Sequence, residues 1–342
     1  MPCRRRFLFF LLSFLIPLAS SVLAAPGYRL LKTVPLGGEG GWDYLTLDAE
    51  ARRLYVSRGS HVVVLDADSL APVGEIPDTP GVHGVALAKE LGRGFTSNGR
   101  AATATIFELA TLRVLGQVKT GGNPDAILYD GVSHRVFTFN GASGDATAFD
   151  GATGGVAGTV ALGGRPEFAV ADGHGQVFVN LEDKAELLRL DAKDLAVRSR
   201  WPLAPCEEPT GLALDAEHRR LFVGCGNRLM AVVDADGGHV VATLPIGRGV
   251  DATAFDAARG LAFSSNGEGT LTVVREESPD RFRVAETVTT QPGARTMALD
   301  PKTHRIFLAT ARFGPPPPPS PDHPHPRGGI LPGTFMILLV GE

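Results

Sequence analysis

The chain has 342 residues, of which 44% are hydrophobic and 20% are charged, and its formal net charge at pH 7 is −4. This mildly acidic balance, with no Lys/Arg cluster in the main part of the chain, argues against nucleic acid or an anionic membrane surface as a partner. A chain of this length buries roughly three quarters of its unfolded surface, so its core needs no metal or disulfide for stability.

Residues 1–24 have the composition of a secretory signal peptide. Residues 4–6 are arginines, residues 7–18 are apolar, and residues 22–24 form a small-residue cleavage site. We therefore expect export to the periplasm or the exterior of a bacterial cell, with cleavage after Ala24. Cleavage removes three arginines and no acid, so the net charge changes from −4 to −7.

Residues 4–8 also bear on the route of export, and the rest of the chain on whether it spans a membrane. The sequence Arg-Arg-Arg-Phe-Leu at residues 4–8 fits the twin-arginine pattern, and an ordinary secretory signal is the alternative. No later segment reaches about 18 uninterrupted apolar residues. The mature chain, residues 25–342, is expected to form one domain without a transmembrane segment.

One motif recurs seven times, as an apolar strand, a short turn and a hydrophobic-aromatic-hydrophobic run such as Leu54-Tyr55-Val56. The residues that begin this run in the seven copies are Leu54, Gly94, Val136, Val177, Leu221, Ala262 and Ile306, and their spacing is 40 to 44 residues. A period of this size with strand-like content is typical of a β-propeller with one blade per repeat. The sequence therefore predicts an all-β fold, a seven-bladed β-propeller of four-stranded antiparallel blades.

The third repeat indicates how a blade divides into strands. We expect strands at residues 126–129, 135–139, 147–149 and 156–162, from the innermost to the outermost. Asn-Gly, Asp-Gly and Thr-Gly pairs between such strands permit tight hairpins. The Asn-Gly steps at Asn98, Asn140 and Asn266 recur at one place in their blades, which favours hairpin chemistry over ligand contacts.

The last repeat supplies only three strands, at residues 295–299, 305–310 and 335–340. Residues 33–37, Thr-Val-Pro-Leu-Gly, match residues 243–247, Thr-Leu-Pro-Ile-Gly, which form an outermost strand. The N-terminal strand is therefore predicted to complete the last blade and close the ring, which leaves no open sheet edge between the first and last blades.

A pair of cysteines and a proline-rich segment are two further features that depart from the repeat pattern. Cys206 and Cys225 are expected on one face of the propeller, where a disulfide would suit export; a soft-metal pair is the alternative. Residues 314–333, with five consecutive prolines, form a predicted stiff loop inserted in the seventh blade. His323 and His325 in this loop either bind Cu²⁺ or Zn²⁺, cover the channel, or are simply exposed.

The main functional signal is the residue that begins each innermost strand, since these strands converge on the central channel. We call these residues the polar ring, and they are Asp43, His83, Asp125, Glu167, Thr210, Asp251 and Arg295, with Trp42 and Glu208 beside them in sequence. Arg295 can pair with Asp251 or Asp43, whereas Asp125 and Glu167 have no such partner in the ring.

Close carboxylates repel one another, which raises a pKa or recruits a cation. The oxygen-rich ring suits Ca²⁺ or Mg²⁺, and His83 would also allow Zn²⁺ or Mn²⁺. The alternative is that these residues are simply solvated at the mouth of the channel.

Several catalytic signatures are absent from the sequence. It has no G-x-S-x-G elbow, no C-x-x-C, no H-E-x-x-H, no C-x-x-C-H and no phosphate-binding P-loop. Nucleophilic serine chemistry, covalent haem attachment and nucleotide hydrolysis therefore lose most of their support.

The repeat core also carries a resemblance. Residues 209–215, 220–223 and 232–234 follow the pattern Pro-x-x-x-hydrophobic-x-Asp, Arg-hydrophobic-Phe-Val and Val-hydrophobic-Asp. This pattern resembles the YVTN-repeat family, and over residues 28–342 the chain looks most like the exported YncE-like propellers of bacteria. The resemblance implies a fold and an exported location, but no catalytic residue, because the repeated residues are packing and turn positions.

Two functional hypotheses follow, and whether the protein is an enzyme stays open. The first is a monomeric binding scaffold whose channel face holds a small molecule, a metal or a periplasmic protein. The second is a metal-dependent hydrolase similar in architecture to gluconolactonase and regucalcin, with Asp125, Glu167 and Asp251 as metal ligands and His83 as general base. Redox service beside a haem or quinone partner is a weaker third hypothesis.

Overall fold

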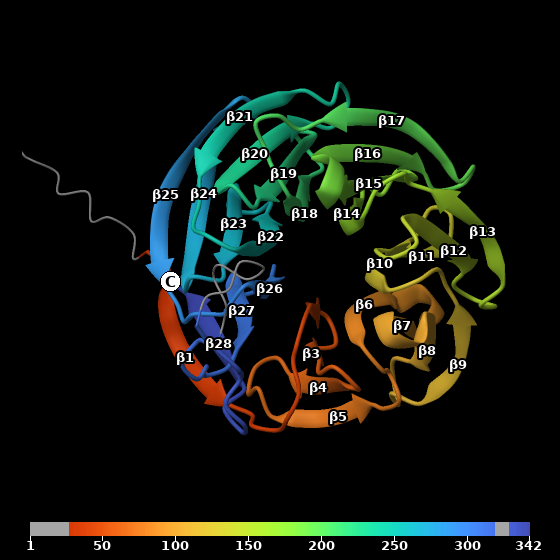
Figure 1. Cartoon of the computed structure of the whole chain (residues 1–342), viewed down its shortest axis with the longest axis horizontal. Coiled ribbons are helices and arrows are strands. Elements are labelled where there is room, and N and C mark those ends of the chain that lie inside the picture. The colour runs from red at the N-terminus through yellow and green to blue at the C-terminus, as the bar shows by residue number, and fades with distance from the viewer. Residues whose placement is uncertain (1–26, 319–327) are drawn as a thin grey trace, which may run out of the picture.

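The computed structural model describes residues 27–318 and 328–342. In these ranges the chain forms seven four-stranded antiparallel sheets that stand as blades around a central axis (Figure 1). The predicted fold class, an all-β propeller with seven four-stranded blades, is confirmed. None of the helices in the described ranges is long and apolar enough to span a membrane.

The blades follow the chain in order, each from its innermost to its outermost strand. Blade 1 has β2 (Leu45–Asp48), β3 (Arg53–Ser57), β4 (Val62–Asp66) and β5 (Pro72–Ile76). Blade 2 has β6 (Val82–Ala88), β7 (Arg93–Asn98), β8 (Thr103–Glu108) and β9 (Val114–Lys119). Blade 3 has β10 (Pro124–Asp130), β11 (Arg135–Asn140), β12 (Asp145–Asp150) and β13 (Val156–Ala161). Blade 4 has β14 (Pro166–Ala171), β15 (Gln176–Leu181), β16 (Glu186–Asp191) and β17 (Ala196–Pro202).

The remaining blades complete the circle. Blade 5 has β18 (Pro209–Asp215), β19 (Arg220–Cys225), β20 (Leu229–Asp234) and β21 (Val240–Pro245). Blade 6 has β22 (Val250–Asp256), β23 (Leu261–Asn266), β24 (Thr270–Ser278) and β25 (Arg281–Thr289). Blade 7 has β26 (Thr296–Asp300), β27 (Arg305–Thr310), β28 (Met336–Gly341) and β1 (Arg29–Pro35). Three short 3₁₀ turns are η1 (Lys89–Leu91), η2 (Gly99–Ala101) and η3 (Glu182–Lys184).

The aromatic residue of each repeat explains why the blades pack into a ring. It lies in the second strand of its blade, and all seven are buried, as Tyr55, Phe95, Phe137, Phe178, Phe222, Phe263 and Phe307. The second strands are buried on both faces because each blade is covered by its two neighbours, whereas outermost strands such as β13 are mostly exposed. The recurring aromatic residues thus supply the hydrophobic layer between blades.

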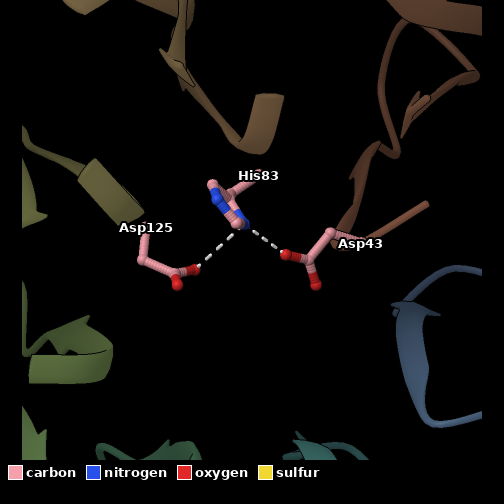
Figure 2. A group of neighbouring side chains, drawn as sticks. All are labelled: Asp43, His83 and Asp125. Atoms are coloured by element: carbon pink, nitrogen blue, oxygen red, sulfur yellow. Dashed lines mark hydrogen bonds and ion pairs between the residues drawn. The ribbon is translucent and has the colours of Figure 1, made fainter. Parts of the chain in front are cut away.

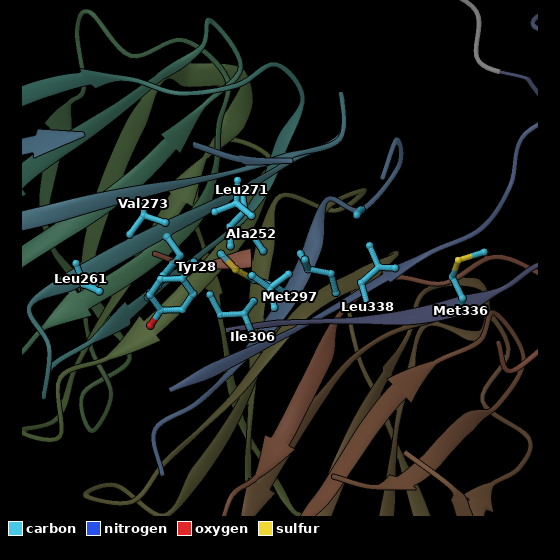
Figure 3. Close-up of a cluster of buried hydrophobic side chains, with 14 residues drawn as sticks. Tyr28, Ala252, Leu261, Leu271, Val273, Met297, Ile306, Met336 and Leu338 are labelled. Atoms are coloured by element: carbon cyan, nitrogen blue, oxygen red, sulfur yellow. The ribbon is translucent and has the colours of Figure 1, made fainter. Parts of the chain in front are cut away.

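The predicted closure of the ring is confirmed. β1 pairs antiparallel with β28, from Arg29 opposite Gly341 to Pro35 opposite Met336. Tyr28, just before β1, packs its ring 5.2 Å from that of Phe263 within a buried cluster of blades 6 and 7 (Figure 3). The N-terminal strand is therefore held both by main-chain pairing and by hydrophobic packing.

The Asn-Gly steps lie at the hairpins between second and third strands, but none of their three glycines has a positive φ, and the asparagine side chains carry the structural role instead. Asn98, Asn140 and Asn266 are buried at the ends of second strands, and each side-chain amide donates hydrogen bonds to hydroxyl groups on the next strand. In blade 2 the acceptors are Thr103 and Thr105, at 3.2 and 2.9 Å. These asparagines hold the second and third strands together.

The predicted disulfide is present, with Cys225 at the end of β19 and Cys206 in the connection before β18, 5.5 Å apart between Cα atoms. The described parts of the proline-rich segment, residues 314–318 and 328–333, lie between β27 and β28 in the chain. The predicted signal peptide, residues 1–24, and the two loop histidines His323 and His325 lie outside the described residues.

Candidate functional site at the central axis

The polar ring residues owe their direction to a repeated irregularity in the innermost strands. In blades 2 to 6 the pairing of the first two strands shifts register just after the first residue of the innermost strand. His83, Asp125 and Glu167 fall within these β-bulges. A bulge frees its residues from the ladder and re-aims their side chains.

Serines of the second strands satisfy the main-chain groups that the ladder leaves unpaired at these positions. Ser97 accepts a hydrogen bond from the Gly84 amide at 2.9 Å and donates one to the Asp125 carbonyl of the next blade at 2.5 Å. In blade 1 the Asp43 amide donates to the Ser57 hydroxyl at 2.9 Å. In blades 1 and 2 the start of the innermost strand is thus held in place without regular strand pairing.

Three ring residues from three successive blades converge on one point (Figure 2). Nδ1 of His83 donates a hydrogen bond to Oδ2 of Asp43 at 2.6 Å and lies 3.5 Å from Oδ1 of Asp125. The possible ligand atoms of these three residues all lie within 4.8 Å of one another, which is close enough to hold one metal ion. We call Asp43, His83 and Asp125 the axial triad.

The axial triad differs from the predicted metal ligands Asp125, Glu167 and Asp251. Nε of Arg295 lies 2.9 Å from Oδ2 of Asp251, so this carboxylate already has a cationic partner. The charge of Asp251 is the main cause that raises the pKa of Arg295. The pairing expected between Arg295 and one of its neighbouring acids is therefore made to Asp251.

Tyr44 occupies the axis beside the triad. Its ring meets that of Phe168 edge to face at 5.3 Å, and its hydroxyl lies 3.4 Å from the carbonyl oxygen of Glu167, so a side chain of blade 1 contacts blade 4. Burial raises the pKa of Tyr44, and the charges of Asp125, Glu167, Asp43 and Asp251 raise it further. Tyr44 is thus surrounded by the acidic members of the ring.

Tyr44 is not among the site residues predicted from the sequence, although the sequence carries a signal for it. The residue after each ring position is Gly, Ala or Thr in five copies, namely Gly84, Ala126, Gly211, Ala252 and Thr296, and is aromatic only at Tyr44 and Phe168. Two large residues among five small ones indicate that these two side chains fill space that the other copies leave free.

Burial and the charges of neighbouring acids raise the pKa values of Glu167 and Asp125. Burial is the largest cause for Glu167, followed by the charge of Asp125, and its pKa rises to about 9. Burial also raises the pKa of Asp125, and the neighbouring His83 only partly offsets this. Without a further positive charge, the ring therefore keeps protons on carboxyl groups that would otherwise be ionised near neutral pH.

The neighbouring acids also change the pKa of His83. Burial lowers its pKa, but the hydrogen bond to Asp43 and the charges of Asp125 and Asp43 outweigh burial, so the pKa of His83 is raised. The triad consequently favours a positive charge at Nδ1, whether a proton or a metal ion carries it.

Three other residues predicted for the site, Thr210, Trp42 and Glu208, lie away from the axial triad. The Thr210 hydroxyl lies 3.4 and 3.2 Å from the carbonyl oxygens of Gly224 and Val250, within the contact between blades 5 and 6. Trp42 packs 5.4 Å from the Phe335 ring. Glu208 is exposed in the connection before β18, with φ of 47°. The structure therefore does not bring these three side chains to the triad.

The comparisons with known proteins support the fold alone. No family model and no curated protein matches the chain. Among solved structures, the chain is similar to Kuenenia stuttgartiensis hydrazine synthase, with a TM-score of 0.69 and 12% identity over 80% of this chain and 92% of that one. It is also similar to U3-55K, with a TM-score of 0.73 and 10% identity over 91% and 98% of the two chains. The RRP9 WD40 repeats give a TM-score of 0.74 and 10% identity over 92% and 97%. At these identities the likeness is one of architecture.

Proposed function

We propose that this protein is an exported binding propeller that holds a divalent cation in the axial triad of Asp43, His83 and Asp125. The observation that carries this proposal is the position of His83 Nδ1, which faces carboxylate oxygens of two other blades at 2.6 and 3.5 Å. Two carboxylates and one imidazole are ligands for Ca²⁺, Mg²⁺, Mn²⁺ or Zn²⁺, with the imidazole favouring the latter two.

A cation would also relieve the repulsion among the acids. The raised pKa values of Asp125 and Glu167 express the free energy needed to ionise half-buried carboxyl groups among other acids. A divalent cation would replace the proton of His83 and lower the pKa values of both acids. The bound ion would then offer open positions to a small molecule or to a partner protein.

Export is the second part of the proposal. The disulfide between Cys206 and Cys225 supports an oxidising compartment, in agreement with the signal-peptide composition of residues 1–24. The resemblance of the repeat core to the YVTN-repeat and YncE-like propellers supports the same location.

A metal-dependent hydrolase is the second candidate, because His83 and Asp43 form a hydrogen-bonded pair of the kind that orients a general base. In that case Asp125 and Glu167 would hold the cation, and the cation would polarise a carbonyl group. Asp251 contributes less to this candidate than the sequence suggested, since it pairs with Arg295.

The test is metal analysis of the purified protein after dialysis against Ca²⁺, Mg²⁺, Mn²⁺ or Zn²⁺ in turn. We expect one equivalent of cation to be lost when Asp43→Asn and Asp125→Asn are combined. The matched control is Glu208→Gln, which removes an exposed carboxylate beside the ring in sequence and should retain the cation. An unchanged metal content in the double variant would show that the axial triad binds no cation.

A further inference from the structure

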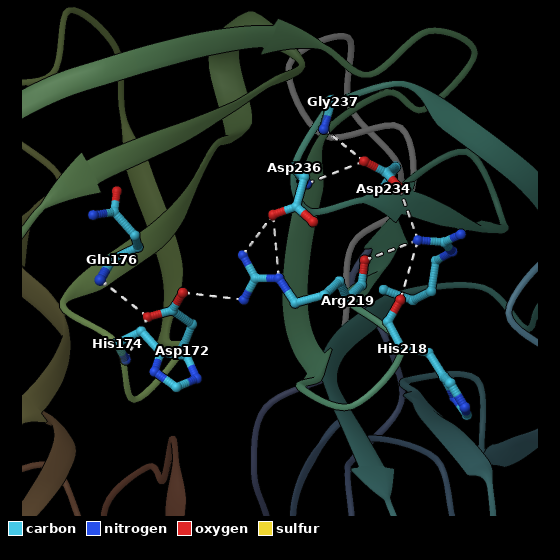
Figure 4. Close-up of polar contacts among 9 residues, drawn as sticks. Asp172, His174, Gln176, His218, Arg219, Asp234, Asp236 and Gly237 are labelled. Atoms are coloured by element: carbon cyan, nitrogen blue, oxygen red, sulfur yellow. Dashed lines mark hydrogen bonds and ion pairs between the residues drawn. The ribbon is translucent and has the colours of Figure 1, made fainter.

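A second group of ligating side chains lies at the opposite end of an innermost strand. Most innermost strands end in an aspartate or are followed directly by one, and four of these aspartates pair with a basic side chain from the next blade. The pairs are Asp48 with Lys89 (3.0 Å), Asp172 with Arg219 (3.1 Å), Asp256 with His304 (2.7 Å) and Asp300 with Arg52 (2.7 Å). Figure 4 shows the pair between Asp172 and Arg219. The Lys and Arg cations of three of these pairs balance the charge of a buried acid, and all four contacts tie neighbouring blades together.

The junction between blades 5 and 6 lacks this arrangement. Arg52, Arg219 and His304 each stand four residues after their own strand-ending aspartate, at a position with positive φ. The same position in blade 6 is Gly260, with φ of 60°, so it offers no cation to Asp215. The buried acid at the end of β18 therefore needs another partner.

The side chains that face Asp215 are one histidine and a second acid. Nδ1 of His218, in the turn after β18, lies 2.8 Å from Oδ2 of Asp215. The same Nδ1 lies 3.0 Å from Oε1 of Glu276, which comes from β24 of blade 6. In Figure 4 the His218 ring points away from the pair between Asp172 and Arg219. We call Asp215, His218 and Glu276 the junction cluster.

Glu276 is buried without a hydrogen bond. Its side chain is 4% exposed, and neither carboxylate oxygen has a hydrogen-bond partner among the described residues, although Oε1 is near His218. Asp215 is 3% exposed, while His218 is 41% exposed. Oε2 of this buried carboxylate has no donor, and Oε1 has only the His218 ring that it shares with Asp215, so a proton or a cation would stabilise the position.

We propose that the junction cluster is a second divalent-metal site, with Asp215 Oδ2, His218 Nδ1 and Glu276 Oε1 as ligands to an ion of the Zn²⁺ class. The three ligand atoms lie within 4.8 Å of one another. The two distances from Nδ1, 2.8 and 3.0 Å, approach the separation of about 3.3 Å between two ligands on one tetrahedral zinc ion. An imidazole nitrogen with two carboxylates favours zinc or manganese over calcium.

The surroundings suit an ion with an open coordination position. The cluster lines a pocket of about 290 Å³, whose other walls include Phe255, Ala257 and Pro279. Three protein ligands beside a pocket leave room for water or a small anionic ligand, as in zinc sites that are not purely structural. The Asp215 Oδ1 atom accepts a hydrogen bond from the Glu217 amide at 3.0 Å, which orients the ligating oxygen.

The electrostatics agree with this geometry. Burial, and then the negative charge of Asp215, raise the pKa of Glu276.

The experiment must separate this site from the axial triad. The background is therefore the full chain carrying Asp43→Asn and Asp125→Asn, dialysed against Zn²⁺ and analysed for metal per chain. We expect one zinc ion in this background and none after Glu276→Gln is added. Glu277→Gln is the matched control, because Glu277 lines the same pocket but pairs with Arg281 and Arg283, and it should keep the ion.

A second variant protects the test against a folding defect. His218→Ala leaves two buried carboxylates without their imidazole partner, so its folding is checked by its circular dichroism spectrum, and the zinc content of the folded variant should fall to zero. The visible absorption of bound Co²⁺ should be lost in the same variant. Zinc retained after Glu276→Gln or His218→Ala, or absent from the background, would overturn the proposal. The proposed axial site fails separately, if wild type and background bind the same number of ions.

Discussion

Nδ1 of His83 in blade 2 lies 2.6 Å from Oδ2 of Asp43 in blade 1. This contact joins two side chains that are 40 residues apart in the sequence, and the Asp125 carboxylate of blade 3 lies 3.5 Å from the same nitrogen. The imidazole thus links three blades at the axis, and its charge state decides how far the acids around it can ionise.

In the metal-free protein, Asp43→Asn should lower the pKa of His83, because its hydrogen bond to a charged acceptor is lost. The folded-state pKa of His83 is raised above the ordinary value of 6.5, so its contribution to stability is full below pH 6.5 and is lost as the pH rises through the folded-state pKa. NMR titration of the imidazole measures this. A pKa of 6.5 or less in the unmodified protein would contradict the assignment.

Glu167→Gln should stabilise the metal-free protein relative to the unmodified chain, and this gain should grow as the pH rises. The carboxyl group of Glu167 has a pKa of about 9 in the folded chain against an ordinary value of 4.5, so the folded state binds the extra proton between these values. Stability therefore falls with pH across this window in the unmodified protein, and the glutamine removes that loss. We expect a gain of more than about 1 kcal/mol at pH 9 and little at pH 4.

Urea unfolding at several pH values, in the presence of a chelator, checks this expectation. Glu208→Gln is the control, since its exposed carboxylate should leave the pH dependence unchanged. Parallel stability curves for Glu167→Gln and the unmodified protein would mean that Glu167 ionises normally.

Arg52→Met should destabilise the junction between blades 7 and 1. Arg52 lies 2.7 Å from Asp300, whose side chain is fully buried, and 2.6 Å from the exposed Asp68. Removing the cation leaves a buried carboxylate uncompensated, which costs about 3 kcal/mol in the free energy of unfolding. Arg113→Met is the control, because its pair with Glu108 is exposed and should be worth less than about 1 kcal/mol. Equal losses in the two variants would exclude a special role for the buried pair.

Replacing Cys206 and Cys225 together by alanine should lower the free energy of unfolding by about 3 kcal/mol, since their disulfide closes a chain segment with a sequence separation of 19. Both side chains are buried, so alanine introduces no unsatisfied polar group. Urea unfolding of the oxidised protein and of the double variant measures the difference. Coincident unfolding curves would show that the disulfide adds no stability.

The division of the chain into blades could be predicted because it depends on residues that are close together in the sequence. The 40- to 44-residue period, the buried aromatic of each second strand and the Asn-Gly hairpins all follow from neighbouring positions on one blade. Closure by the N-terminal strand could also be predicted, because β1 resembles an outermost strand and the last repeat lacked one. Strand ends were less accurate: β10 begins at Pro124 rather than residue 126, because the strand includes a bulge that a periodic pattern does not reveal.

The sequence by itself determined where the seven innermost strands begin to within two residues, and so it predicted the polar ring. Only the tertiary structure showed that the side chains of Asp43, His83 and Asp125 lie together. It also showed that Asp251 pairs with Arg295 and that the Thr210 hydroxyl contacts the next blade. The junction cluster of Asp215, His218 and Glu276 was likewise invisible, because two neighbouring blades supply it. Local sequence specifies hydrogen-bonded strands, but the direction of a side chain at the axis depends on bulges and on the rotation between blades, which only the closed ring establishes.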